Sequence, residues 1–291
     1  MPGQPCFSVF LANYMATAAL HDLQLAVRTR REDLVCHILK RNEKLNINSS
    51  FLKTTVLSLA VLQKSVNIVE LLLNNGADPN KLSQDPLGRI EPPIFTACRL
   101  NQLEIASMLL ERGADPNATN YYHHSPLWAA VMERNIDLCE MLIAYGANLN
   151  QGDKSGQCAL NLAIKYCSGR EKIAKLLIAH GANVDFVDGK DRSSLAYAIY
   201  CCNATIVDAL LKVGVTVSYE VRKQCCTDKV KYNPSQLLVT DHLMTPKTLQ
   251  DISIIEVRRS LMKFSQGTSI WPKIEQLSLP QTLRTALKIH Y

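Results

Sequence analysis

The chain has 291 residues, about twice the usual length of one domain, which excludes a peptide hormone or a lone helical bundle and predicts one long domain or two modules. Apolar residues make up 47% and charged residues 20% of the chain, so a disordered protein is excluded and a sizeable core is expected. The net charge of +6 is concentrated after residue 217, where 11 Lys and Arg are scattered among 6 Asp and Glu, a pattern that predicts an acidic protein partner and no nucleic acid.

Two further features bear on the compartment. No run of eighteen apolar residues is present, so no membrane span is expected. The first 27 residues hold no Arg or Lys to open a signal peptide, and the ten cysteines are therefore expected to be reduced and buried, in a cytoplasmic and also nuclear protein. Cys201, Cys202, Cys225 and Cys226 form two adjacent pairs without the two-residue gap of structural zinc sites, so no metal is predicted.

The N-terminal residues lead into a long repeat. Residues 1–19 contain the apolar stretch Cys6–Met15, which we interpret as a packed cap. An alanine then recurs at intervals of 34, 37, 33, 33 and 35 residues, at Ala26, Ala60, Ala97, Ala130, Ala163 and Ala198. A period near 33 residues predicts a solenoid, which extends over residues 20–217.

Each repeat is predicted to contain two short helices. The alanine lets the first helix approach its neighbour closely, and an aliphatic pair that follows it by 12 residues, or by 14 in the fifth unit, fills the space between units. The pairs are Ile38-Leu39, Leu72-Leu73, Leu109-Leu110, Leu142-Ile143, Leu177-Ile178 and Leu210-Leu211. From the second unit onward a glycine stands three residues later, where a helix end favours left-handed backbone, at Gly76, Gly113, Gly146, Gly181 and Gly214.

After the glycine, residues 76–80 and 113–117 read Gly-Ala-Asp-Pro-Asn. The units thus resemble ankyrin repeats, whose hallmarks are Gly-Ala-Asp-x-Asn after the second helix and Thr-Pro-Leu-His at the start of the first. The resemblance implies an all-α solenoid of about six repeats. The second hallmark is degraded, and we expect some of the family's Thr/His hydrogen bonds to be lost, because the histidine is replaced by Gln24, Ser58, Phe95, Trp128, Asn161 and Ala196.

One join between repeats is longer than the others. Residues 81–93 carry three prolines and account for the 37-residue step. Insertions at such joins lie on the exposed loop side, and tyrosine and arginine are favoured interface anchors, so a target-recognition surface is predicted here. Its residues are Arg89, Tyr121, Tyr122, His123 and His124. A tolerated spacer and a solvated finger loop are the alternatives.

Catalytic motifs are absent from the sequence. There is no phosphate-binding loop, no Gly-x-Ser-x-Gly elbow and no His-Glu-x-x-His helix. Gly189-Lys190 lies in a turn between repeats and lacks the upstream glycine of a phosphate loop. We therefore expect a protein that is not an enzyme and uses no cofactor.

After Val217 the period stops, and residues 218–245 are interpreted as a connector or a half-repeat cap. Thr245-Pro246 supplies a helix N-cap and a first helical proline, and an amphipathic run follows. One arc of this helix gathers Leu249, Ser253, Ile254, Val257, Leu261 and Phe264, and a second, nearly opposite arc gathers Ile252, Ile255 and Met262. A helix with two apolar faces needs two partners, one of them external.

Leu249, Ser253 and Val257 follow one another at intervals of four residues. Residues 246–291 thereby resemble a SOCS box, the adaptor-binding module of ubiquitin-ligase substrate receptors, whose first helix has leucine, cysteine and an aliphatic residue at these positions. The resemblance implies binding to elongin C through Leu249, Ile252, Ser253, Val257 and Leu261. A serine hydroxyl in place of the cysteine is expected to weaken that binding by roughly 1–3 kcal/mol unless it finds a hydrogen bond.

A second short motif follows at Leu277-Ser278-Leu279-Pro280. It resembles the family's Leu-Pro-aliphatic-Pro motif, which is associated with cullin-5 when complete, and implies cullin contacts through Leu277, Leu279 and Pro280. The first proline is missing here, which removes preorganisation of about 0.4–1 kcal/mol.

The two motifs in order, after an ankyrin array, resemble the ankyrin-repeat and SOCS-box family. That resemblance implies a non-catalytic substrate receptor, in which residues 20–217 hold a target protein and residues 246–291 dock on elongins B and C and a cullin of the cullin-5 type, with its RING protein. Two alternatives stay open. Residues 246–291 are either an adaptor-binding module or extra helices that cap the stack, and in the second case the protein is a plain ankyrin scaffold or inhibitor.

Overall fold

The computed structural model describes residues 7–42, 45–50, 52–166, 169–219, 221–222, 234–244, 249–277, 279 and 281–287, with backbone alone for residues 7–16, 243–244, 249–253 and 282–283. The chain divides into two compact units, Met1–Tyr121 and Tyr122–Tyr291. Among the described helices, none combines the length and apolar character needed to cross a membrane.

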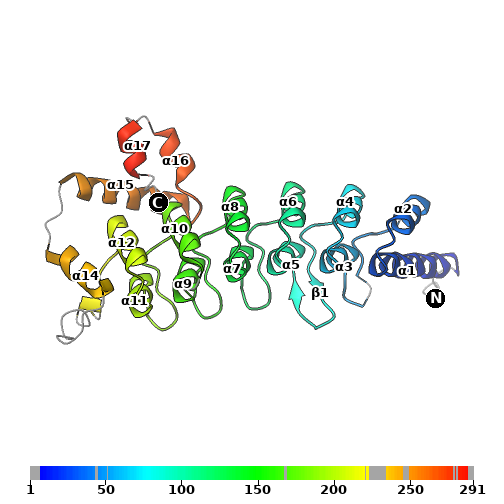
Figure 1. The fold of residues 1–291 in the computed structure, drawn as a ribbon. Helices are drawn as coiled ribbons and strands as arrows, with labels where there is room; N and C mark the ends of the chain where they lie inside the picture. The colour runs from blue at the N-terminus through cyan, green and yellow to red at the C-terminus, as the bar shows by residue number, and fades with distance from the viewer. Residues whose placement is uncertain are drawn as a thin grey trace, which may run out of the picture. The chain divides into compact units, whose positions relative to one another are not determined.

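In the first unit, the described residues form three helix pairs and a short hairpin (Figure 1). The first helices of the pairs contact one another in succession, and so do the second helices. In chain order the elements are α1 (Phe7–Arg28), α2 (Glu32–Arg41), α3 (Val56–Leu62), α4 (Val66–Asn74), β1 (Ser83–Gln84), β2 (Ile90–Glu91), α5 (Pro93–Arg99) and α6 (Leu103–Glu111). Helix α1 is continuous through residue 19, so the boundary expected there between cap and array falls inside a helix.

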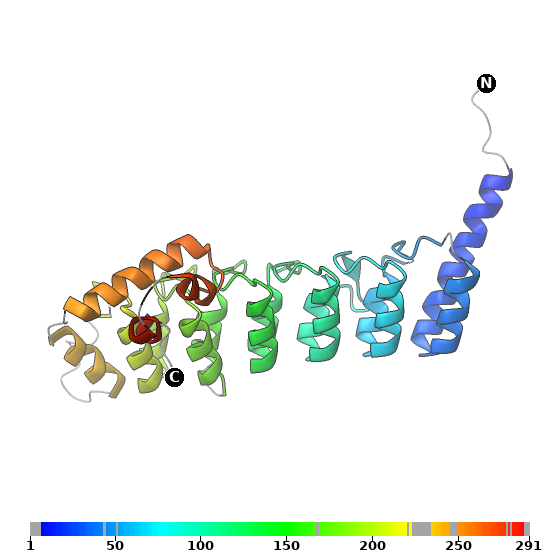
Figure 2. The ribbon, with the colours of Figure 1, turned by 90° about the horizontal axis from the view of Figure 1, so that it is seen from above.

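In the described part of the second unit, three more helix pairs are followed by the helices α14 to α17, which lie outside the repeat pattern. The paired helices are α7 (Pro126–Met132), α8 (Ile136–Ala144), α9 (Ala159–Lys165), α10 (Glu171–Ala179), α11 (Ser194–Tyr200) and α12 (Ala204–Val213). The others are α14 (Pro234–Met244), α15 (Leu249–Ser265), α16 (Trp271–Gln276) and α17 (Gln281–Leu287). Figure 2 shows α15 lying across the loop ends of the last repeats. Helix α14, in the expected connector, packs against α11 and α12.

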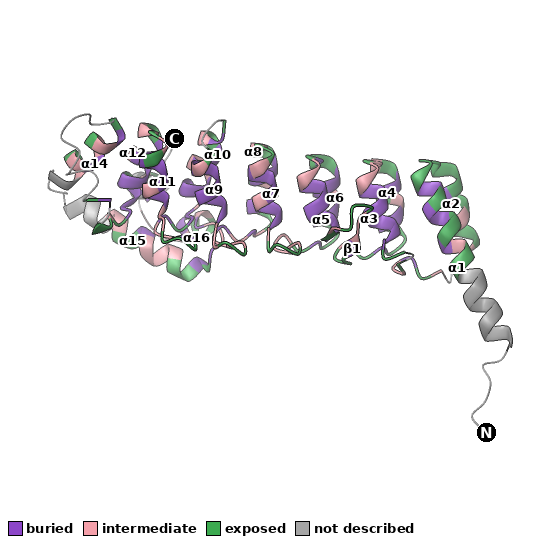
Figure 3. Ribbon diagram, turned by 90° about the horizontal axis from the view of Figure 1, so that it is seen from below, coloured by how far each residue is buried: buried purple, intermediate pink, exposed green. Residues whose placement is uncertain are grey.

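The repeat signals have the structural roles that the sequence predicts. All six alanines of the column are at most 3% exposed, and the aliphatic pairs are buried from the second repeat onward, whereas Ile38-Leu39 is half-buried. Buried residues therefore line the facing sides of the helices in each unit (Figure 3). Serine or threonine caps begin several first helices: Thr55, Ser125 and Ser193 each accept the backbone N–H three residues ahead, as helix N-caps do.

A glycine follows the second helix of each repeat from α4 to α12, either as its C-cap or directly after the C-cap. The five glycines have φ between +83° and +91°, the left-handed region that the sequence predicts for them. A polar ladder follows the glycine and joins successive repeats: Asn80 Oδ1 accepts the backbone N–H of Asp115 at 2.8 Å, and Asn150 Oδ1 accepts that of Asn183 at 2.7 Å. Each such bond satisfies a loop amide of the following repeat.

Other side chains replace the hydrogen bonds expected to be lost with the family's histidine. Gln24 Nε2 donates to the Thr54 carbonyl oxygen at 2.9 Å, which joins two repeats. Asn161 Oδ1 accepts the Ser194 hydroxyl at 2.6 Å and joins two others. At these two positions, amide side chains therefore supply hydrogen bonds between repeats.

The cysteines follow the expectation only in part. Cys98, Cys139 and Cys158 are buried, and desolvation raises the pKa of the Cys139 thiol to about 12, which keeps it protonated. Cys202, in contrast, is exposed after α11, and Cys225 and Cys226 lie outside the described residues.

Candidate protein-binding surfaces

Helix α15 is joined to α16 and α17 by a small apolar core. Ile270, Ile274 and Leu287 are each at most 3% exposed and form its centre. The partly buried side chains that pack around them are Ile254, Leu261, Met262, Trp271 and Leu279. The last three helices of the second unit therefore form a module with a core of its own.

The module docks on the repeats where two glycines leave room. An added Cβ at Gly181 would lie 2.7 Å from the Cγ2 of Ile270, and at Gly214 it would lie 2.5 Å from the Cγ2 of Ile255. At Gly76, Gly113 and Gly146 an added Cβ would meet nothing within 4 Å. The glycine that ends each second helix thus has a further role in the last two repeats, because its missing side chain admits an isoleucine of the module.

Arg258 is the polar centre of this docking. Its side chain is 1% exposed, and its guanidinium donates to the carbonyl oxygens of Ile178 at 2.7 Å and Ala179 at 2.9 Å, and to that of Leu287. These carbonyls belong to the C-terminal ends of α10 and α17, where a cation is favoured by the helix dipole. Arg259 adds a bond of 2.7 Å to the Gly214 carbonyl.

His180 and Trp271 complete the junction. Their rings stack with centroids 4.2 Å apart, and the Trp271 Nε1–H donates to the Ala179 carbonyl at 3.1 Å. The Ile270 amide donates to the His180 carbonyl at 2.9 Å, and His180 Nδ1 lies 2.7 Å from the Ser269 hydroxyl oxygen. Desolvation, with a smaller contribution from the charge of Arg258, lowers the pKa of His180 to about 4, so its imidazole is neutral at physiological pH.

The opposite side of α15 is open in the described part of the chain. Val257 is 41% and Phe264 76% exposed, and Glu256 and Lys263 beside them are exposed as well. We call Val257 and Phe264 the outer apolar face of α15. Large apolar side chains fixed on an ordered helix and open to solvent are typical of protein-binding surfaces.

The arcs expected for this helix are therefore partly wrong. Leu261 and Ile254 were expected on the same arc as Val257 and Phe264, but they turn toward the module core. Arg258 lies on the inward side of the helix, where it is buried in the junction and donates to the Ile178 carbonyl. Of the predicted elongin-binding residues, Val257 is exposed and Leu261 is half-buried, and the side chains of Leu249, Ile252 and Ser253 lie outside the described residues.

The predicted cullin-binding residues have different surroundings. Leu277 is half-buried directly after α16, and Leu279 packs against the module core. The Leu279 carbonyl accepts the Nε–H of Arg284 at 2.8 Å, which ties this segment to α17. Pro280 lies outside the described residues.

In the first unit, Arg89 and Tyr121 of the predicted target-binding set differ in exposure. Arg89 pairs with Asp85 at 2.6 Å and thereby closes the β1–β2 hairpin, so its guanidinium has a structural role. Tyr121 is 67% exposed. The predicted set does not include the leucines of this hairpin, although Pro86 and Gly88 on either side of Leu87 mark the tip of a turn.

In the second unit, Tyr122 and His124 of the predicted target-binding set form part of an aromatic stack. The His124 ring stacks on Trp128 with centroids 3.7 Å apart, and the centroid of the Tyr122 ring lies 5.7 Å from that of His124. His124 Nε2 is 3.8 Å from the Asp153 carboxylate. His123 is exposed with a left-handed φ of 62°. Tyr122 and His123 are thus accessible, whereas His124 is half-buried.

Comparisons with known proteins agree with the repeat architecture. A family model described as "Ankyrin repeats (3 copies)" matches residues 23–120, 94–188 and 127–221. An ankyrin repeat domain from Acinetobacter baumannii has a similar structure, with a TM-score of 0.61 and 28% identity over 67% of this chain and 98% of that one.

Two curated proteins are also similar in sequence. Alpha-latrocrustotoxin-Lt1a of Latrodectus tredecimguttatus is 34% identical over 127 residues, which span 43% of this chain and 9% of the toxin. The ankyrin repeat protein FPV230 of fowlpox virus is 27% identical over 145 residues, 50% of this chain and 74% of that protein. Since the family model matches more than half of its residues, the chain belongs to the ankyrin-repeat family.

Proposed function

We propose that this chain is the substrate-recognition subunit of an elongin B/C–cullin–RING ubiquitin ligase, with a cullin of the cullin-5 type. Ankyrin repeats point to protein–protein interaction, and in this proposal they hold the target. The chain itself is not an enzyme. It acts in the cytoplasm, and also in the nucleus, by raising the effective concentration of target lysines near a ubiquitin-charged enzyme that the RING protein carries.

The observation that supports the proposal is the outer apolar face of α15. Helix α15 is held along its inward side by Arg258, Ile255 and the module core, and yet Val257 and Phe264 remain exposed. A helix that served only as a cap would have little reason to present two large apolar side chains to water. Val257 occupies the aliphatic position of the SOCS-box motif, so the open face includes one of the residues that the resemblance assigns to elongin C.

Rigid docking of the module also suits a receptor. A tether raises the effective concentration of a target only if its geometry allows both ends to engage at once. The bonds from Arg258 and Trp271 to the end of α10 fix α15 on the last repeats of its unit. The module would therefore present its ligase partners in one orientation to a target bound by these repeats.

The test is co-expression of the full chain with elongins B and C. The proposal expects a soluble ternary complex that Val257→Glu disrupts, because a carboxylate buried in an apolar interface without a partner costs several kcal/mol. Leu237→Glu on α14 is the matched control, since Leu237 is 45% exposed in the same unit. A chain that never co-purifies with elongins supports the alternative, an ankyrin scaffold or inhibitor without ligase association.

A further inference from the structure

The β1–β2 hairpin of the first unit displays apolar side chains that no part of the proposed function uses. Leu87 at its tip is 77% exposed, Leu82 before β1 is 55% exposed and Ile90 in β2 is 46% exposed. Leu52, from the neighbouring repeat, is 75% exposed. Backbone contacts bring this second segment to the hairpin, because the Gln84 amide donates to the Lys53 carbonyl at 3.0 Å.

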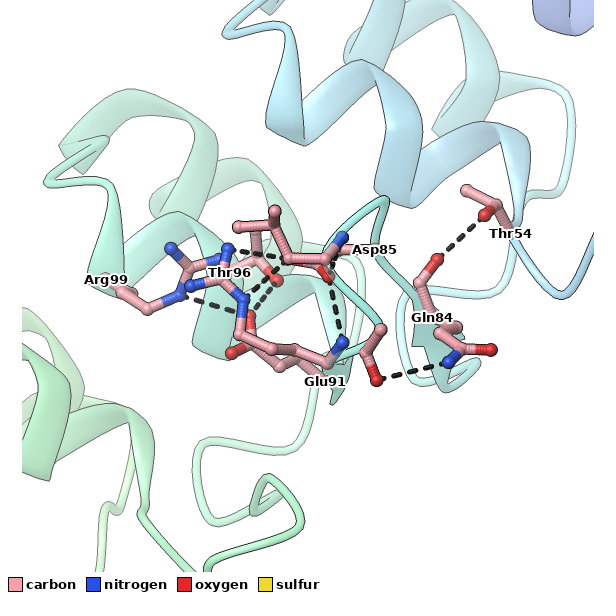
Figure 4. A network of polar contacts seen from close by, with 9 residues as sticks. Thr54, Gln84, Asp85, Glu91, Thr96 and Arg99 are labelled. Atoms are coloured by element: carbon pink, nitrogen blue, oxygen red, sulfur yellow. Dashed lines mark hydrogen bonds and ion pairs between the residues drawn. The ribbon is translucent and has the colours of Figure 1, made fainter.

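The hairpin holds these side chains on an ordered scaffold. Asp85 Oδ1 accepts the amides of Leu87 at 2.8 Å and Arg89 at 2.9 Å, and the Arg89 guanidinium closes the turn on the same carboxylate. At its base, buried Glu91 accepts the Arg99 guanidinium at 2.9 Å and the Thr96 hydroxyl at 3.1 Å (Figure 4). A partner that binds here would not have to order the loop first, which lowers the cost of binding.

The neighbouring segment is strained in a way that exposes its leucine. Leu52 has φ of 51° and Lys53 has φ of 64°, two consecutive left-handed residues that are not glycine. The Thr54 hydroxyl, which donates to the Gln84 carbonyl at 2.7 Å, ties the segment to the hairpin. Backbone strain of this kind is concentrated at functional sites, because it persists only where the surrounding structure enforces it.

Two positively charged side chains lie among these apolar residues. Lys53 and Lys81 are exposed beside the leucines, whereas the charge of Arg89 is neutralised by Asp85. We propose that Leu52, Lys53, Lys81, Leu82, Leu87 and Ile90, here called the hairpin patch, bind a segment of a target protein that combines aliphatic or aromatic residues with Asp or Glu. This inference rests on the target-binding part of the proposed function and is independent of the adaptor-binding face.

A protein segment fits this patch better than an anionic membrane. Basic clusters that recognise acidic lipids typically contain about four to eight Lys or Arg residues. Each residue raises the affinity for the membrane by about tenfold or less. The patch offers two exposed lysines. The ankyrin repeats that carry it belong to a family used for protein interaction.

The test is selection of random phage-displayed peptides on the immobilised full chain. The proposal expects enriched peptides that pair apolar residues with Asp or Glu and that bind Leu87→Ser about tenfold or more weakly, since burial of one leucine accounts for at least a tenfold change in affinity. The Lys53→Glu, Lys81→Glu double variant should also lose binding. Leu103→Ser is the matched control, because Leu103 is 39% exposed on α6 of the same unit and outside the patch.

Three outcomes would overturn the inference. These are enrichment of basic peptides, enriched peptides that bind Leu87→Ser as well as the unmodified chain, and no enrichment above an uncoated surface. Sedimentation with phosphatidylcholine vesicles that contain phosphatidylserine tests the other occupant: binding that Leu87→Ser abolishes would assign the patch to a membrane. Co-purification of Leu87→Ser with elongins B and C separates a failure of this inference from a failure of the adaptor proposal.

Discussion

Gly214 and Gly146 allow a sharp test of how the C-terminal module is docked. Both glycines end the second helix of a repeat, with φ of +87° and +85°. Alanine at either position should lower the stability of the folded state by about 1–2 kcal/mol, because its Cβ disfavours left-handed backbone. At Gly214 the new Cβ would also lie 2.5 Å from Ile255 Cγ2 and 3.1 Å from its Cδ1, whereas at Gly146 it meets nothing within 4 Å.

The Gly214→Ala variant should therefore lose more stability than Gly146→Ala. Overpacking of this kind typically costs about 1–3 kcal/mol, so we expect a difference of that size between the two variants. Because Ile255 lies on α15, the loss should be concentrated in that helix. Hydrogen exchange followed by mass spectrometry measures it, since exchange reports the free energy of local opening.

A second variant identifies the cause. Ile255→Ala added to Gly214→Ala should recover part of the lost protection, because the smaller side chain leaves room for the new methyl group. Equal loss of protection in α15 for Gly214→Ala and Gly146→Ala would refute the docking account. So would a double variant whose losses simply add, because the two side chains would then not meet.

Two further predictions concern the same junction. Arg258→Met should lower the free energy of unfolding by about 1–3 kcal/mol, because the backbone carbonyl oxygens that accept hydrogen bonds from Arg258 would lose their donor. An unchanged midpoint of chemical denaturation would contradict this prediction. His180 has a pKa lowered from 6.5 to about 4, so its neutral form favours the folded state. The contribution of neutral His180 to the stability of the folded state is complete above pH 6.5 and declines as the pH falls toward 4. The melting temperature of a His180→Gln variant should therefore decline less over that range than the melting temperature of the unmodified chain.

Much of the repeat architecture can be predicted from the sequence because each signal has a local cause. The alanine at 163 must be small to let helices approach, and the glycine at 181 must adopt left-handed backbone. Both requirements recur in every full repeat, so they appear in the sequence as columns. Gly181 has a second role, because its missing side chain makes room for Ile270. This role cannot be recognised from the repeat period, since it depends on a residue 89 positions further along the chain.

The orientation of α15 was harder to predict for a different reason. Hydrophobic periodicity treats an arginine as a mark of the solvent side, since charged residues are seldom fully buried. Arg258 is buried because two helix ends supply carbonyl oxygens for it, and those helix ends come from α10 and α17. A pattern within one helix cannot contain that information, and it therefore did not separate Leu261, which packs against the module core, from exposed Val257.

The hairpin shows a similar limit. Arg89 was expected to contact a target because arginine is common at interfaces, but it lies four residues after Asp85 in a tight turn and folds back on that carboxylate. The pairing leaves Leu87 at the tip as the exposed side chain. Because Arg89 is paired with Asp85, the hairpin exposes a leucine at its tip instead of an unpaired arginine.

The most direct test of the central claim is a calorimetric titration of the full chain with the purified elongin B/C complex. The outer apolar face of α15 should bind one complex per chain, and Val257→Glu should weaken the affinity at least about a hundredfold, because several kcal/mol are lost when a carboxylate is buried unpaired. Leu237→Glu should leave the affinity unchanged. Absence of binding by the unmodified chain, or equal affinity for the Val257→Glu variant, would contradict the account.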